Sequence, residues 1–216
     1  MEYLDSIQLE FPWIKKFTWK PWVAPKTGWI PRSCSEASVS WYQFTDDAEE
    51  AEVIIVNTCG FLSAASQESI TRILELSDLK QEGRCEKLVA AGCVTQRYGG
   101  ELAQKIPEID GLLGSNGFEQ IPELLDQLYH PQSQFKQFLQ KKPHYRQDQQ
   151  QERIQSTPSH YAYLKIAEGC SNMCSFCNIP YLRGGFSSRS IESLVQDFSK
   201  LVERGVSEIN LLPRTR

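Results

Sequence analysis

Three cysteines in one short segment are the residues of this chain best suited to chemistry. Cys170, Cys174 and Cys177 are separated by three and then two residues, so one tight loop can fold three thiolates around one face of a metal cluster. An iron–sulfur cubane normally takes four thiolates, one for each iron. Three thiolates therefore leave one iron open to the amine and carboxylate of a small molecule.

Two other interpretations of this segment stay open. A structural zinc site needs four closed ligands, and no fourth Cys or His lies within the loop 168–177. Buried cysteines also cluster by chance, because free Cys behaves as a small hydrophobic residue. The ligand set favours an iron–sulfur cluster over both alternatives.

Composition and charge limit the function classes further. The 216 residues are 40% hydrophobic, which is enough for one sizeable core or two smaller ones. The formal net charge of -4 argues against a protein that binds nucleic acid strongly through broad electrostatic attraction. With no long apolar run and no N-terminal signal pattern, we expect a cytoplasmic protein that does not associate with membranes. The odd number of cysteines favours metal ligation over disulfides.

The elements that must position further cysteines alternate between strand and helix. Apolar runs predict strands at 53–56, 87–91 and 109–113, and helical spacing predicts helices at 63–79, 95–105 and 118–129. This alternation predicts a small parallel α/β domain. Because ligands in such sheets bind beyond the carboxyl ends of the strands, Cys59 and Cys93 are expected to share one rim.

A second α/β unit begins near residue 160. The pattern predicts a strand at 161–167 before the cysteine loop, then a helix at 191–202 and a strand at 209–212. So short a repeat cannot close or cover its own sheet, so we expect the first repeats of a β/α barrel. The expected organisation is an unassigned segment 1–42, an N-terminal domain 43–130, a linker 131–159 and the incomplete barrel 160–216.

The cysteine loop, with Phe176 directly before its third cysteine, resembles the signature loop of the radical S-adenosylmethionine superfamily. The resemblance implies a 4Fe–4S cluster on Cys170, Cys174 and Cys177, S-adenosylmethionine at the open iron, and Phe176 lining the adenosine pocket. It also implies that the cofactor is cleaved to a 5'-deoxyadenosyl radical, which abstracts hydrogen. An electron donor protein is then an expected partner.

The segments 56–61 (VNTCGF) and 91–98 (AGCVTQRY) resemble the N-terminal domain of methylthiotransferases. This resemblance implies a second cluster with Cys59 and Cys93 among its ligands. The later segment 179–184 (IPYLRG) and the pair 188–189 are most similar to the branch that modifies a small-subunit ribosomal protein. The implied function is addition of a methylthio group to the β-carbon of an aspartate. The branch that modifies adenosine in transfer RNA is the alternative.

The chain departs from the family at both ends. The third ligand of the second cluster is expected on the first strand, whereas Cys34 lacks the family's flanking Gly and Asn and lies too close to Cys59. The resemblance also implies the rest of the barrel and a small C-terminal β domain after residue 216, and we expect this chain to lack them. These departures suggest that the chain is a gene fragment or the product of a frameshift. An intact reading frame at the locus that encodes only these residues would refute that hypothesis. A catalytically inactive remnant is a further alternative.

Three other residues are of interest. Arg183 and Arg189 either bind cofactor or substrate anions or have a structural role. Cys85, in a polar segment, is expected to be an exposed free thiol and not a ligand.

Overall fold

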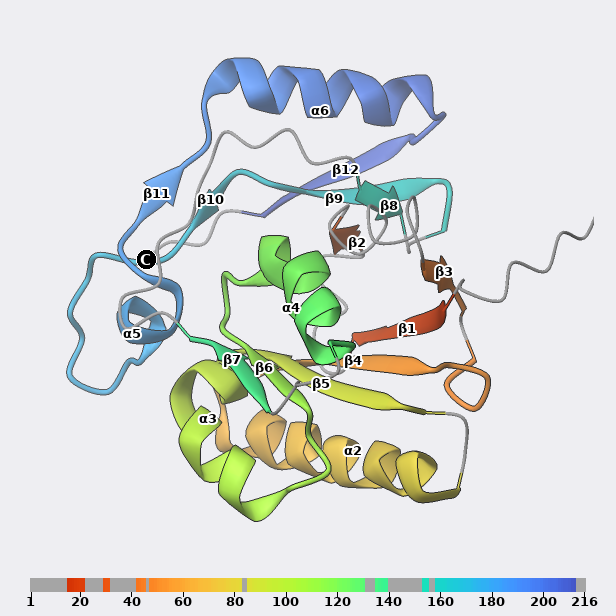
Figure 1. Ribbon diagram of the computed structural model, residues 1–216. Helices are drawn as coiled ribbons and strands as arrows, with labels where there is room; N and C mark the ends of the chain where they lie inside the picture. Colours follow the sequence, from red (N-terminus) through yellow and green to blue (C-terminus); the bar gives the residue numbers. More distant parts are fainter. Residues whose placement is uncertain are drawn as a thin grey trace, which may run out of the picture.

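The computed structural model describes residues 15–21, 29–31, 42–45, 47–82, 85–130, 135–139, 153–155 and 158–212. Its largest unit is a six-stranded sheet with the order β3-β1-β4-β5-β6-β7, in which every neighbouring pair is parallel (Figure 1). The strands are β1 (Lys15–Pro21), β3 (Tyr42–Phe44), β4 (Val53–Thr58), β5 (Lys87–Gly92), β6 (Gly111–Leu113) and β7 (Lys136–Phe138).

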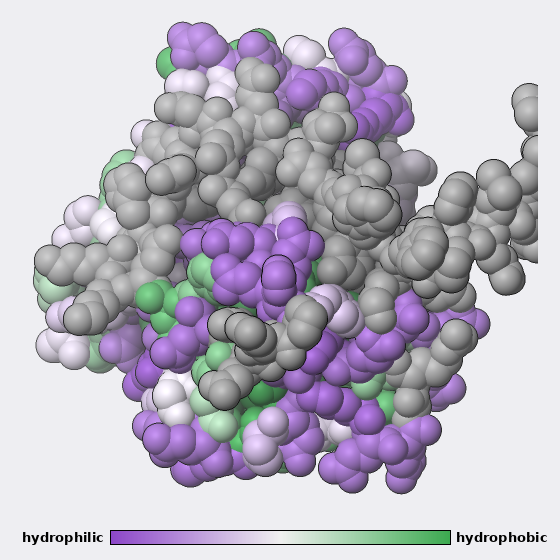
Figure 2. Space-filling model, viewed as in Figure 1, coloured by the Kyte–Doolittle hydropathy of each residue, from purple (hydrophilic) through white to green (hydrophobic). Residues whose placement is uncertain are grey.

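Helices cover both faces of this sheet (Figure 1). The helices α2 (Ser63–Glu82) and α3 (Cys93–Lys105) lie on one face. The helix α4 (Ile121–Leu128), preceded by the 3-10 helix η1 (Phe118–Gln120), lies on the other. The described surface on this side of the molecule is mostly hydrophilic (Figure 2), as expected for helices that bury one apolar stripe.

Strand β4 is buried on both faces, which explains its unbroken apolar sequence. Val53 and Ile55 pack in one core cluster with the leucines of α4. Ile54 and Val56 point the other way and pack in a second cluster with α2, which contributes Ile73 and Leu76. The period-two alternation of a strand thus divides one run between two cores.

A second, smaller unit follows along the chain. The strands β9 (Tyr161–Lys165) and β12 (Glu208–Leu212) are parallel, with α6 (Ile191–Glu203) between them in sequence. Between β9 and α6 lie β10 (Ala167–Glu168), α5 (Ile179–Arg183) and β11 (Ser187–Ser188). A separate antiparallel pair joins β2 (Trp29–Pro31) to β8 (Arg153–Gln155). The start of a barrel stays a prediction, because the described residues contain one β/α repeat of it.

The predicted α/β fold class is confirmed, and the strands and helices expected between 53 and 129 are present. The structure adds strands that local patterns did not predict, since β1, β3 and β7 join the same sheet. The domain boundaries proposed from the sequence stay predictions. No described helix is long and apolar enough to span a membrane.

The expectation for Cys85 is wrong in one respect. Its thiol is free, but the side chain is only 5% exposed and belongs to the core cluster beneath α2. Polar neighbours in the sequence did not reveal this, because burial here depends on packing against other elements. Cys34 lies outside the described residues.

Candidate functional site

Cys59 and Cys93 lie at the carboxyl ends of two neighbouring parallel strands. In the register of β4 and β5, Thr58 is opposite Gly92. Cys59 follows β4 directly, and Cys93 is the first residue of α3. The two cysteines therefore share one rim of the sheet, as predicted.

The two turns that carry these cysteines are in direct contact at Gly60. A Cβ atom at Gly60 would lie 2.9 Å from the carbonyl carbon of Cys93 and 3.0 Å from the amide nitrogen of Val94. The Thr58 hydroxyl donates to the Ala91 carbonyl at 2.7 Å and accepts from the Val94 amide at 3.2 Å. These contacts hold the backbone of both cysteine turns in one arrangement.

The loop with the other three cysteines is closed at its base by a short antiparallel ribbon. In this ribbon Glu168 is opposite Ser187. The Cys170 amide donates to the Gly184 carbonyl at 3.1 Å, and the Ser171 hydroxyl accepts from the Phe186 amide at 3.0 Å. The segment 171–183 therefore forms one loop that leaves the second unit and returns to it at the ribbon.

None of the three cysteines of this loop forms a disulfide, but their side chains differ in exposure. Cys170 is buried at the base, Cys177 is half-buried and Cys174 is exposed. A turn joins the last two, since the Cys177 amide donates to the Cys174 carbonyl at 3.1 Å. The Phe176 side chain is 88% exposed. The donor chemistry therefore fits a thiolate-ligated cluster.

Their arrangement does not by itself form a metal site. Across the described ranges, no three His, Cys, Asp or Glu side chains are grouped so that they could hold a metal ion. The assignment of Cys170, Cys174 and Cys177 as ligands thus rests on residue type, spacing and the shared loop.

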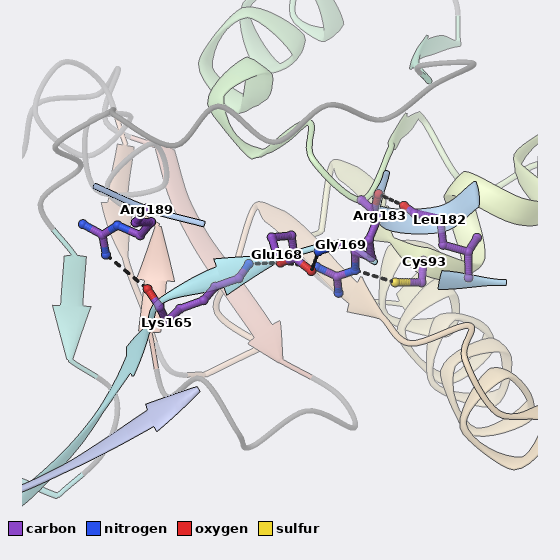
Figure 3. A network of polar contacts seen from close by, with 8 residues as sticks. Cys93, Lys165, Glu168, Gly169, Leu182, Arg183 and Arg189 are labelled. Atoms are coloured by element: carbon purple, nitrogen blue, oxygen red, sulfur yellow. Dashed lines mark hydrogen bonds and ion pairs between the residues drawn. The ribbon is translucent and has the colours of Figure 1, made fainter. Parts of the chain in front are cut away.

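A polar network joins this loop to the rim of the sheet (Figure 3). Glu168 is only 1% exposed, and one carboxylate oxygen, Oε2, pairs with both Lys165 and Arg183. The second oxygen, Oε1, accepts from the Gly169 amide at 3.3 Å. The Arg183 Nε–H donates to the sulfur of Cys93 at 3.2 Å. One guanidinium therefore contacts a rim cysteine and the carboxylate next to the cysteine loop.

Arg189, the other arginine singled out from the sequence, has a structural role between β11 and α6. It is 6% exposed, and its NH2 group donates to the Ser193 hydroxyl at 2.6 Å and to Asp197 at 2.7 Å. These contacts tie β11 to α6.

Sequence reasoning missed Glu168; the available signal was an acid two residues before the first cysteine of the loop.

Comparison with known proteins gives a consistent result. Residues 35–114 match the family model described as "Uncharacterized protein family UPF0004". Over 171 residues the chain is 46% identical to the ribosomal protein uS12 methylthiotransferase RimO of Geobacter sulfurreducens and of Trichlorobacter lovleyi, covering 79% of this chain and 38% of each relative. The RimO of Caldicellulosiruptor saccharolyticus is 41% identical over 179 residues, which cover 83% of this chain and 40% of the relative. The chain thus spans about two fifths of the length of these relatives.

Proposed function

Because this chain belongs to the methylthiotransferase family, we propose that it forms part of a radical S-adenosylmethionine enzyme that adds a methylthio group to an aspartate β-carbon of ribosomal protein uS12. The observation that carries the proposal is the placement of five cysteines, none of them in a disulfide, in two groups. Two lie on the rim and three on the loop, and one polar network joins the two groups. The substrate named for the relatives, ribosomal protein uS12, supports the choice of substrate.

Cys170, Cys174 and Cys177 are the residues that would hold the first 4Fe–4S cluster, with S-adenosylmethionine beside Phe176. When bound, this cluster supplies the electron that cleaves the cofactor. The chain contributes a loop whose base is pinned by the Cys170 amide and the Gly184 carbonyl. Burial of Cys170 keeps water away from one side of the site.

The rim with Cys59 and Cys93 is the proposed place of a second cluster. Cys59 and Cys93 supply two thiolates, and a cubane with an open iron uses three. The third ligand would come from a residue outside the described ranges. Cys34 lies there, but it lacks the family's flanking Gly and Asn. The proposed partners are uS12 as substrate and an electron donor protein, in the cytoplasm.

The cluster assignment is tested by anaerobic reconstitution with iron and sulfide, followed by iron analysis, visible absorbance and assay of 5'-deoxyadenosine release. About four irons per chain that disappear in Cys174→Ala indicate the loop site alone, and about eight indicate both sites. Cys85→Ala is the matched control, since it removes a thiol from the core and not from a site. Bound zinc with no iron would refute the cluster assignment.

The substrate is tested in a chimera in which this chain replaces the matching part of the Geobacter sulfurreducens relative. The expected product is uS12 that carries a methylthio group, detected by mass spectrometry of its peptides. Transfer RNA from the same reaction is analysed in parallel. Methylthioadenosine in transfer RNA with unmodified uS12 would overturn the assignment.

A further inference from the structure

The helix α5 is docked on the same rim that carries Cys59 and Cys93. Its last residue, Arg183, contacts the sulfur of Cys93 through Nε–H at 3.2 Å. The residue before it, Leu182, is buried, and its carbonyl accepts a hydrogen bond from the Ser115 hydroxyl. Ser115 follows β6, the strand next to β5. Two successive residues of α5 thus contact the carboxyl-end turns of two neighbouring strands.

The same arginine also faces the base of the cysteine loop. Its NH1 group lies 3.4 Å from the Oε2 atom of Glu168, two residues before Cys170. Glu168 already pairs with Lys165 at that oxygen, so neutralising this carboxylate is not the sole role of Arg183. The contact with Cys93, on the other unit, is the part that Lys165 does not duplicate.

The guanidinium of Arg183 can bind two acceptors on different elements at the same time. Its donors lie in one rigid plane, so Nε and NH1 can serve acceptors in different directions at the same time. A lysine at this position would carry the charge but present it as a point at the end of a flexible stem. The sulfur of Cys93 and the carboxylate of Glu168 are both buried, which keeps water from replacing either contact.

We propose that Arg183 is a positioning residue that locks the cysteine loop onto the Cys59/Cys93 rim and so sets the separation of the two candidate cluster sites. This inference rests on the proposed function for its biological meaning. The docking itself is a property of the chain without iron. Because the Arg183 side chain stabilises both segments, local unfolding of the cysteine loop and local unfolding of the rim turns are coupled.

Hydrogen–deuterium exchange on the iron-free chain tests the coupling. In Arg183→Gln, the amides of the rim segment 93–98 and of the loop segment 170–186 are expected to exchange about tenfold faster, which corresponds to about 1.4 kcal/mol of opening free energy. Arg183→Lys is expected to restore part of the protection in both segments. Arg204→Gln, at the end of α6, is the matched arginine control and leaves both segments unchanged.

Faster exchange confined to the loop, with the rim unchanged, would show that Arg183 acts on Glu168 alone and would overturn the inference. If Arg183→Gln also exposes the amides of β4, the variant has unfolded, and Ser115→Ala replaces it. Ser115→Ala removes the other contact of α5 without a change of charge, and it is expected to speed exchange in both segments; unchanged exchange would overturn the inference. Because iron is absent, failure of the cluster assignment does not affect this result.

Discussion

Gly92 lies so close to Thr58 that a Cβ atom at position 92 would be 2.5 Å from the Thr58 carbonyl oxygen. The same atom would be 2.9 Å from the side-chain oxygen of Asn57. Gly92 also has φ +105, a conformation that L side chains rarely adopt. The turn that places Cys93 at the rim therefore requires glycine.

We expect Gly92→Ala to lower the free energy of unfolding by at least about 3 kcal/mol, because backbone strain of about 1–3 kcal/mol adds to a clash with backbone atoms. Urea unfolding followed by circular dichroism measures the change. Gly100→Ala is the control, since a Cβ there has nothing within 4 Å and alanine favours a helix. Equal stability of the two variants would contradict the close approach.

Asp110 joins β5 to the end of α2. Its Oδ2 atom accepts from the Lys80 ammonium at 2.6 Å and from the Leu88 amide at 2.8 Å. Asp110→Asn is expected to cost about 2 kcal/mol in urea unfolding, because it weakens hydrogen bonds to a charged group that is only 18% exposed. The control is Glu75→Gln, whose partner is Arg72 and whose side chain is 54% exposed. That change is expected to stay within about 0.5 kcal/mol, and a similar loss in both would refute the prediction.

Burial raises the pKa of the Cys85 thiol from 9.0 to about 11. Below pH 9 the thiol is protonated in both states and has no effect on stability through titration. Between about pH 9 and pH 11 the unfolded chain loses this proton while the folded chain keeps it, so stability falls as pH rises, by up to about 3 kcal/mol.

Urea unfolding at pH 8 and pH 10.5 checks this prediction in the wild type and in Cys85→Ala. Other groups also titrate in this range, so the informative quantity is the difference between the two proteins. The wild type is expected to lose more stability than the variant. Parallel losses would mean that the Cys85 thiol titrates normally.

Gly169 closes the base of the cysteine loop. Its φ is +73, and a Cβ there would meet the carbonyl oxygens of Gly184 and Gly185. Gly169→Ala is expected to loosen the loop, so that chymotrypsin cleaves after the exposed Phe176 several times faster. Gly205→Ala has a similar φ of +83 but open space around the new Cβ. This variant therefore measures the backbone strain alone, about 1–2 kcal/mol, and cleavage at Phe176 is expected to stay unchanged. Equally fast cleavage in the two variants would exclude the clash at Gly169 as the cause.

Local sequence determined much of this protein. The apolar run 53–56 and the helical spacing after residue 63 are short-range patterns, and β4 and α2 form around the segments that those patterns predict. Strand polarity follows from the alternation of strand and helix, which is why Cys59 and Cys93 were expected at one rim. The spacing of the three cysteines in the loop is likewise local information.

Tertiary structure decided the rest. The sequence pattern left the segment of β1 unassigned, yet β1 pairs with β4 from Phe17 opposite Val53 to Pro21 opposite Asn57. The edge of β4 offers backbone hydrogen bonds to a strand that is distant in sequence. Cys85 is buried despite polar neighbours, since core packing depends on contacts distant in sequence.

The contact between Arg183 and Cys93 joins residues 90 positions apart. Two separate elements must dock before these side chains can meet, and no local pattern encodes the docking of one unit on another. Sequence therefore identified which residues have the chemistry, and the fold determined which of them act together.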